Sequence, residues 1–147
     1  MFDKSKKISL SDKRKKYTEG FCAPQWLFKK IDKEFHFDLD VCATTENTKC
    51  DRYYTEEEDG LSRVWFGNAW CCPDCGKNPS AWVKKALGSN CNTVMLLNVN
   101  THAEWFHKYL YYNPNIEIRF LEGSIKTRSS ATTGRPMMLV IIRNEKV

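Results

Sequence analysis

Short apolar runs and amphipathic segments alternate along the chain from about residue 24 to residue 142. Apolar residues recur near helical spacing in PQWLFKKIDKEF, which predicts a helix over 24–35 that begins at a proline. Start and stop signals predict two further helices, over 78–88 and 101–112. Alternating or continuously apolar residues predict strands at 37–42, 69–72, 93–97, 116–121 and 137–142.

Strands that alternate with helices indicate an α/β fold, in which helices pack on both faces of a layered sheet. Several of the predicted strands are continuously apolar, as strands buried on both faces are. Ligands of such sheets bind beyond the carboxyl ends of the strands. We therefore expect the chemistry of this protein to follow the strands that end near Asp40, Cys72, Leu97 and Leu121.

The length and composition are those of one domain with a real core, because 41% of the 147 residues are apolar. No run approaches the roughly 20 apolar residues of a membrane span, and no apolar stretch typical of a secretory signal follows the N-terminus. We therefore expect a cytoplasmic protein that does not enter a membrane. The seven cysteines are odd in number, which argues against a disulfide framework and leaves buried thiols, metal ligands or reactive thiols.

The positive charge is concentrated at the N-terminus. Residues 1–16 hold seven Lys or Arg against two Asp and so account for the whole net charge of +5, whereas residues 17–147 hold equal numbers of bases and acids. This asymmetry predicts a basic, flexible arm at 1–17 and a single domain at 18–147. The arm contains four consecutive bases that are candidates for contacts with DNA phosphates, namely Lys13, Arg14, Lys15 and Lys16.

The segment that follows the strand at 69–72 contains two cysteines on a short turn. Cys72 and Cys75 are separated by Pro73 and Asp74 and are followed by a glycine, which is the spacing of a zinc knuckle. A tetrahedral zinc site needs two more ligands; no second CxxC pair exists in the chain, and Cys42 and Cys50 could complete the site if the fold brings them near. The alternative is that these cysteines are buried and pack as small apolar residues.

A series of short motifs follows in order over residues 23–143. They are PQWLF at 24–28, FDLDVCA at 37–43, EN at 46–47, KC at 49–50, Tyr54, DGL at 59–61, WV at 82–83, MLL at 95–97, WFH at 105–107, IRFLEG at 118–123 and MLVI at 138–141. The series resembles the phage-type DNA adenine-N6 methyltransferases. The resemblance implies a compact Rossmann-like sheet, S-adenosylmethionine as methyl donor, a bacterial host cell, and adenine in DNA as acceptor, taken out of the base stack for reaction.

The resemblance also implies an Asn-Pro-Pro-Tyr motif at 72–75. In that motif an amide oxygen and a backbone carbonyl accept the N–H bonds of the adenine amino group, and the aromatic ring stacks on the base. This chain has Cys72, Pro73, Asp74 and Cys75 there. Thiol sulfur is a weak acceptor, and Cys75 has no ring, so we expect methyl transfer to be weak or absent.

The cofactor contacts implied by the resemblance fall on Pro24, Asp40, Asp59 and Leu61. Asp40 ends the first strand, where a carboxylate could bind the ribose or the ammonium group of S-adenosylmethionine; the alternative is a solvated or capping carboxylate. Asp59 and Leu61 resemble a segment near the adenine ring of the cofactor. The acids at 56–58 are expected to be a solvated surface, and Trp26, Trp82, Trp105 and Phe106 are expected to be core residues.

The stretch 124–135 is rich in Ser, Thr and Gly and contains Lys126, Arg128 and Arg135. Such a loop can place several bases along a DNA backbone, together with the N-terminal arm. DNA is therefore the expected partner, although a neutral body is unusual for a strong DNA binder. The alternative is a pseudo-methyltransferase that keeps the fold and acts as an inhibitor, by binding DNA or a host protein such as a nuclease or restriction component.

Overall fold

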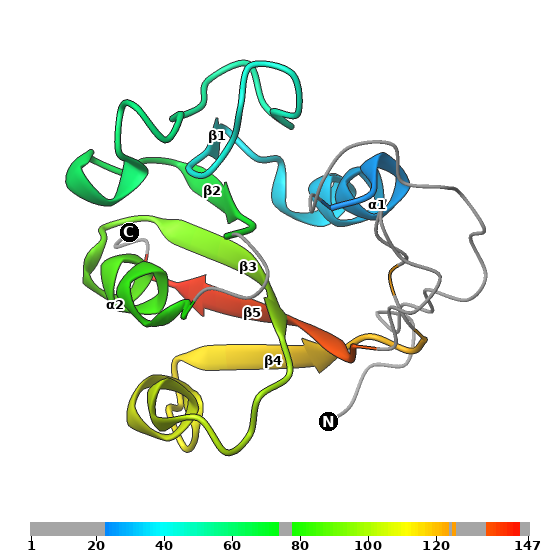
Figure 1. Ribbon diagram of the computed structural model, residues 1–147, viewed down its shortest axis with the longest axis vertical. Coiled ribbons are helices and arrows are strands. Elements are labelled where there is room, and N and C mark those ends of the chain that lie inside the picture. The colour runs from blue at the N-terminus through cyan, green and yellow to red at the C-terminus, as the bar shows by residue number, and fades with distance from the viewer. Residues whose placement is uncertain (1–22, 74–77, 124, 126–134, 145–147) are drawn as a thin grey trace.

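The computed structural model describes residues 23–73, 78–123, 125 and 135–144 (Figure 1). Five strands form one sheet in the order β1-β2-β3-β5-β4. The strands are β1 (Leu39–Asp40), β2 (Asn68–Cys71), β3 (Asn92–Asn98), β4 (Ile116–Phe120) and β5 (Met137–Arg143). β1, β2 and β3 are parallel, and β5 is antiparallel to its neighbours β3 and β4. The carboxyl ends of β1 to β4 therefore meet at one edge of the sheet, together with the amino end of β5.

Helices cover both faces of this sheet, as the sequence predicts. The helix α1 (Gln25–Phe35) packs on one face, where Leu27, Phe28 and Ile31 join a buried cluster with Trp70 and Leu139. The helix α2 (Ser80–Gly88) and the π-helix η3 (Phe106–Leu110) pack on the other face. Figure 1 shows α1 apart from α2 and η3. Successive strand residues alternate between the two clusters because side chains of a strand point to opposite faces.

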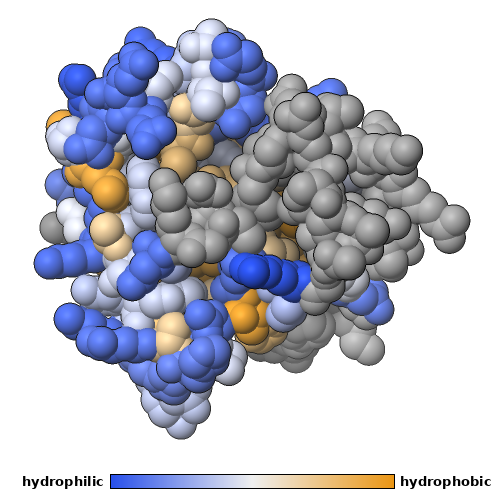
Figure 2. Space-filling model, in the orientation of Figure 1, coloured by the Kyte–Doolittle hydropathy of each residue, from blue (hydrophilic) through white to orange (hydrophobic). Residues whose placement is uncertain are grey.

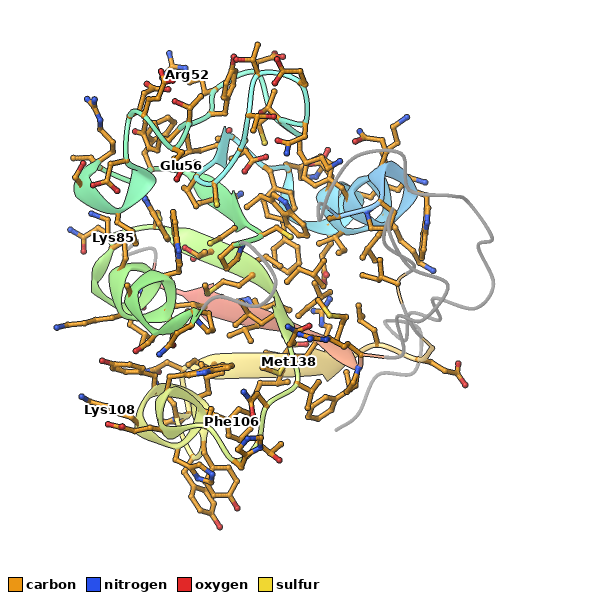
Figure 3. The ribbon with its side chains drawn as sticks, viewed as in Figure 1. Arg52, Glu56, Lys85, Phe106, Lys108 and Met138 are labelled. Carbon is orange, nitrogen blue, oxygen red and sulfur yellow. The ribbon has the colours of Figure 1, made fainter. Side chains whose placement is uncertain are left out.

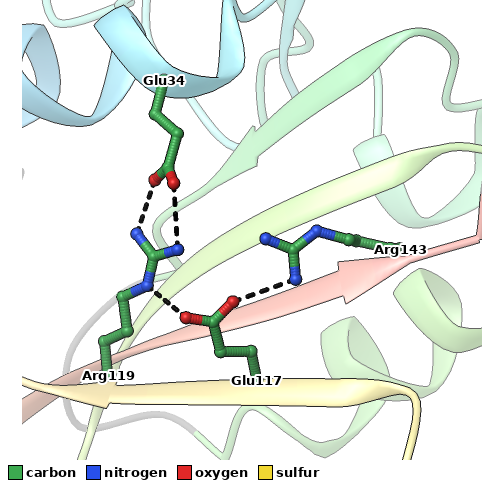
Figure 4. A network of polar contacts seen from close by, with 4 residues as sticks. All are labelled: Glu34, Glu117, Arg119 and Arg143. Atoms are coloured by element: carbon green, nitrogen blue, oxygen red, sulfur yellow. Dashed lines mark hydrogen bonds and ion pairs between the residues drawn. The ribbon is translucent and has the colours of Figure 1, made fainter. Parts of the chain in front are cut away.

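A chain of ion pairs connects α1 to β4 and β5 (Figure 4). These two strands lie on the side of the sheet opposite β1, and this side is called the far edge below. The Arg119 guanidinium on β4 donates to Glu34 on α1 at 2.5 and 3.1 Å and to Glu117 at 2.5 Å. Glu117 also accepts a hydrogen bond from Arg143 on β5 at 3.0 Å. These contacts hold α1 on the sheet by polar interactions in addition to its apolar face.

The predicted elements are found, with differences at three of them. The strand predicted at 37–42 is only β1, because the N–H of Cys42 turns inward to donate to the Asp40 side chain instead of continuing the ladder. The helix predicted at 101–112 is wider and shorter, and the N–H of Tyr111 donates to Phe106 O, five residues back, at 2.8 Å. The helix predicted at 78–88 begins at Ser80, whose N–H donates to Asn78 Oδ1.

The coloured part of the surface in Figure 2 is mainly hydrophilic, with scattered apolar patches. Among the residues that the structure describes, the large apolar or aromatic ones that are more than half exposed are Val64, Tyr111, Tyr112 and Phe120. Among the described residues, no helix combines the length and the apolar character that crossing a membrane requires.

Candidate ligand pocket

A pocket of about 310 Å³ lies where β1 and β2 end. Its walls come from the segment directly after β1, from Cys72 directly after β2, from the long connection between these strands, and from α2. The residues that line it are Cys42, Ala43, Thr44, Asn47, Tyr54, Thr55, Glu56, Asp59, Gly60, Cys72 and Trp82. The volume is at the lower end of the range for small-molecule sites, and the position matches the carboxyl-edge rule for ligand binding in open sheets.

The connection between β1 and β2 is held in shape by turns that satisfy their own backbone groups. Thr44 N–H donates to Asn47 Oδ1 at 2.7 Å, and Asn47 N–H donates to Thr44 Oγ1 at 3.1 Å. Thr55 and Glu58 form the same reciprocal arrangement in a second turn of this connection. Thr55 N–H donates to Glu58 Oε1 at 3.2 Å, and Glu58 N–H donates to Thr55 Oγ1 at 3.3 Å. This pairing is that of a capping box, and it fixes both turns on the rim of the pocket. Figure 3 shows Glu56 on this connection, away from Phe106 and Lys108 on η3.

The wall between η2 (Gly60–Ser62) and α2 depends on close backbone approach. A Cβ added at Gly60 would lie 2.1 Å from Val41 O and 3.5 Å from the ring of Trp82, so only glycine fits there. Gly60 O accepts a hydrogen bond of 2.8 Å from Trp65 Nε1, and the Trp65 ring stacks on Trp82 with centroids 6.1 Å apart. Trp82 therefore forms an aromatic wall of the pocket, and stacking on Trp65 holds its ring in place.

Asp40 lies beneath the pocket loop, with only 2% of its surface exposed. Its Oδ1 accepts the N–H of Cys42 at 3.2 Å and its Oδ2 accepts the N–H of Lys49 at 3.0 Å. Burial raises the pKa of Asp40 to about 6, and the two backbone donors and the Lys49 charge oppose that rise. Asp40 is not among the described residues that line the pocket.

The other predicted cofactor contacts are placed differently. Asp59 lines the pocket, with its backbone in the left-handed region at φ 56°. Leu61 is half-buried and Pro24 is buried at the start of α1, and neither is among the described lining residues. Of the predicted catalytic positions, Cys72 lines the pocket and Pro73 is buried beside it, whereas Asp74 and Cys75 lie outside the described residues.

Among the predicted DNA contacts, Arg135 is exposed just before β5, at the same edge of the sheet as the pocket. The other bases lie outside the described residues: Lys13, Arg14, Lys15, Lys16, Lys126 and Arg128.

Asn100, after β3 at this edge, has a buried Oδ1 that no hydrogen-bond donor of the described chain reaches. A ligand or base that donates a hydrogen bond would satisfy this acceptor.

Two residues of the pocket lining have the environments expected for them. Trp82 was expected in the core; it is half-buried, packs against the core cluster and also lines the pocket. Glu56 was expected on a solvated surface and is exposed, on the pocket rim. Neither was identified as a lining residue. Tyr54 and Asn47 were not identified as site residues either. All four belong to the connection or to α2, which the strand pattern does not bring to the ends of β1 and β2. The signal that could have identified them was the placement of Tyr54, Asn47 and Trp82 within the family-like motifs.

The thiols of Cys50 and Cys71 are not activated as nucleophiles. Burial raises the pKa of Cys50 to about 12 and raises the pKa of Cys71 well above its ordinary value. Within the ranges that the structure describes, no three His, Cys, Asp or Glu side chains are grouped as a metal site requires. The zinc alternative therefore has no support from the described residues, and Cys75, its second ligand, lies outside them.

Comparison with known proteins gives concordant matches. A family model described as DNA N-6-adenine-methyltransferase (Dam) matches residues 10–146. The DNA N-6-adenine-methyltransferase of Haemophilus phage HP1 (strain HP1c1) is 31% identical over 147 residues, which cover 91% of this chain and 84% of the phage protein. The DNA N-6-adenine-methyltransferase of Escherichia phage T1 is 35% identical over 75 residues, which cover 48% of this chain and 31% of that protein.

Proposed function

The chain belongs to the DNA N-6-adenine-methyltransferase family, and we propose that it binds S-adenosylmethionine in the pocket while methylating adenine in DNA slowly or not at all. The observation that carries the proposal is that Cys72, at the expected catalytic position, lines the same pocket as Asp59 and Trp82. Ligand binding and the altered catalytic position would then meet in one site. The parallel core of β1, β2 and β3 is compatible with a Rossmann-like methyltransferase sheet.

The lining residues suit the chemical groups of S-adenosylmethionine. Trp82 and Tyr54 offer aromatic surface for an adenine ring, and Asn47 offers an amide. The carboxylates of Glu56 and Asp59 suit the net positive charge of the cofactor and the diol of its ribose. When bound, S-adenosylmethionine supplies an electrophilic methyl group. The residues of this chain bind and orient it.

Slow transfer follows from the side chain at position 72. The amino group of adenine is a poor nucleophile because its lone pair is delocalised into the ring, and an oxygen acceptor at this position localises that lone pair. The Cys72 sulfur accepts hydrogen bonds only weakly. Loss of one well-placed polar partner of this kind costs about 10²–10³ in rate, and the sequence also lacks the aromatic residue at position 75.

Two measurements on the same protein separate binding from chemistry. Calorimetric titration with S-adenosylmethionine should give a dissociation constant in the micromolar range, and labelled methyl transfer to adenine-containing DNA should stay near background. The triple variant Cys72→Asn, Asp74→Pro and Cys75→Tyr should raise transfer by at least about 10²-fold. Absence of binding would overturn the proposed cofactor site, and ready turnover by the unmodified chain would overturn the proposed loss of activity.

Thiol footprinting locates the bound cofactor. Cys42 and Cys72 line the pocket, whereas Cys50 is half-buried and outside the described lining. S-adenosylmethionine should slow alkylation of Cys42 and Cys72, read by mass spectrometry, and leave Cys50 as the internal control. Equal protection of all three thiols would indicate general tightening of the fold and would contradict binding in this pocket.

The second candidate is a pseudo-methyltransferase that binds DNA or a host protein as an inhibitor. The replacement of the catalytic motif at 72–75 favours it. If DNA is the partner, the basic residues 1–16 should carry much of the affinity, and their deletion should flatten the dependence of DNA binding on salt. DNA binding with an unchanged salt slope after the deletion would remove the arm from the interface.

A further inference from the structure

The carboxylate of Asp40 bridges the two ends of the loop that forms one wall of the pocket. Its two oxygens accept N–H groups from Cys42 and Lys49, which are seven residues apart in the chain. Between these two residues the loop supplies Ala43, Thr44 and Asn47 to the pocket. The side chain itself is buried beneath the loop. The Asp40 carboxylate thus holds the two ends of the loop together from beneath, and it does not itself line the pocket.

The backbone of Asp40 joins this loop to the second pocket segment. Asp40 N–H donates to Arg52 O at 3.0 Å, and Tyr54 N–H donates to Asp40 O at 2.9 Å. Ala43 N–H in turn donates to Tyr54 O at 3.0 Å. Both segments that line the pocket after β1 therefore take their position from Asp40, one through its side chain and the other through its main chain.

We propose that Asp40 is a positioning residue that holds the loop from Cys42 to Lys49 in its ligand-binding shape and does not touch the ligand. The identity of the ligand, S-adenosylmethionine, rests on the proposed function, whereas the loop-holding role does not. This assignment replaces the direct cofactor contact that the sequence predicts for Asp40.

A carboxylate is suited to this task because it presents two acceptors and no donor. Both partners are N–H donors, so an amide of the same shape would turn an NH₂ group toward one of them. Protonation of Asp40 has a similar effect, because it replaces one acceptor by an O–H donor. The loop should therefore loosen when Asp40 gains a proton, and ligand affinity should fall with it.

The groups around Asp40 fit a single titration in this range. Lys49 is the charged neighbour that favours the ionised form, and burial opposes it and raises the Asp40 pKa to about 6. The neighbouring thiols of Cys50 and Cys71 have raised pKa values, so they stay protonated where Asp40 titrates. A transition near pH 6 that the amides of Cys42 and Lys49 share is then assigned to Asp40, because both amides donate to its carboxylate.

The first test uses the unaltered protein without any ligand. The amide protons of Cys42 and Lys49 are followed by nuclear magnetic resonance from pH 5 to pH 8. Both should shift with one common midpoint near 6, because both are bonded to the titrating carboxylate. Absence of a common midpoint at these two amides would overturn the proposal, whether or not the protein binds S-adenosylmethionine.

The second test compares Asp40→Asn with Asp38→Asn. Asp38 is exposed, two residues earlier, and its carboxylate accepts the Asn68 N–H at 2.9 Å away from the pocket loop. At pH 8, Asp40→Asn should weaken S-adenosylmethionine binding at least tenfold and speed amide exchange over 42–49. The Asp38→Asn control should stay within twofold of the unaltered protein in both measurements.

The pH profile distinguishes loop positioning from a general structural role. Affinity of the unaltered protein and of Asp38→Asn should fall below pH 6, whereas the weak affinity of Asp40→Asn should not change with pH. A folded Asp40→Asn protein with unaltered affinity and exchange would overturn the proposal. If Asp40→Asn does not fold, the amide titration decides. If the unaltered protein binds no S-adenosylmethionine at any pH, the proposed function fails, and amide exchange still tests the loop.

Discussion

Two regions of this sheet bury charge in opposite ways. At the pocket, the Asp40 carboxylate is 2% exposed and is satisfied by backbone N–H groups. At the far edge, Arg119 is satisfied by the carboxylates of Glu34 and Glu117. The pKa of Asp40 is raised by burial to about 6, whereas the hydrogen bond from Arg119 lowers the pKa of Glu117.

The difference shows what each region can do. Charges that neutralise one another, as around Arg119, keep their ionisation over a wide pH range and serve to fasten α1 to β4. The Asp40 carboxylate is bonded only to backbone N–H groups and has Lys49 as its charged neighbour, and these do not offset desolvation, so its pKa stays raised to about 6. The pocket region therefore responds to pH near 6, whereas the far edge responds only at more acidic pH, where Glu117 gains a proton.

The largest expected effect is a contrast of sign in the pH dependence of stability. The Asp40 pKa is higher in the folded chain than its ordinary value of 3.8, so its contribution is lost as pH rises through about 6. The free energy of unfolding of the unaltered protein, relative to Asp40→Asn, should fall by up to about 3 kcal/mol between pH 4 and pH 7. Denaturant unfolding at a series of pH values measures this difference.

Glu117 gives the matched case of opposite sign. Its pKa is lowered in the folded chain, so its contribution to stability is present above its ordinary pKa of 4.5 and lost as pH falls through the lowered value. Relative to Glu117→Gln, the unaltered protein should therefore lose stability on acidification. Parallel pH profiles for the two variants would remove the contrast between the regions.

An intermediate effect is expected at the aromatic wall of the pocket. Gly60→Ala places a Cβ 2.1 Å from the backbone oxygen of Val41, so the wall must move, at a cost of about 1–3 kcal/mol in unfolding free energy. Affinity for S-adenosylmethionine should fall as well, measured by the same titration. Gly88→Ala is the control, because nothing lies within 4 Å of its added Cβ. Equal effects of both variants would contradict the importance of close approach at Gly60.

The smallest effect is expected at the far edge. Arg119→Met removes the bonds to Glu34 and Glu117, whose side chains are 34% and 37% exposed and so regain water. The unfolding free energy should fall by about 1 kcal/mol, with S-adenosylmethionine affinity unchanged, and Arg119→Lys should recover part of the loss. A tenfold loss of affinity in Arg119→Met would show that the two regions are coupled.

The sequence predicted the central strands well because their apolar runs are continuous. β3 and β5 lie within one residue of the predicted segments, and their full ladder pairs Thr93 with Ile142 and Leu97 with Met138. The edge strand β1 was overestimated, because hydrophobic alternation continues past Asp40 while hydrogen bonding turns to its side chain. The π-helical geometry of η3 was not predicted, since it differs from an α-helix in hydrogen bonding and hardly in apolar pattern.

Two of the predicted site residues, Cys72 and Asp59, line the pocket that we propose as the cofactor site. Their catalytic and cofactor-binding roles stay predictions. Tyr54 and Trp82 were missed as lining residues because they come from segments with no strand pattern, and only packing brings them to the ends of β1 and β2. Asp40 ends β1, as the sequence predicts, and its carboxylate accepts N–H groups of the loop, because a carboxylate at a strand end can point into the loop as well as into the pocket.

By itself, the sequence determined the family, the layered α/β class and the altered residues at 72–75, because these depend on residue type and order along the chain. Only the tertiary structure decided which residues share the pocket and which bury their charge beneath it. The reason is that the fate of a buried polar group depends on donors from distant segments, here Lys49 for Asp40 and Glu34 for Arg119. Residue type fixes what a group can bond, and the fold fixes which partner it meets.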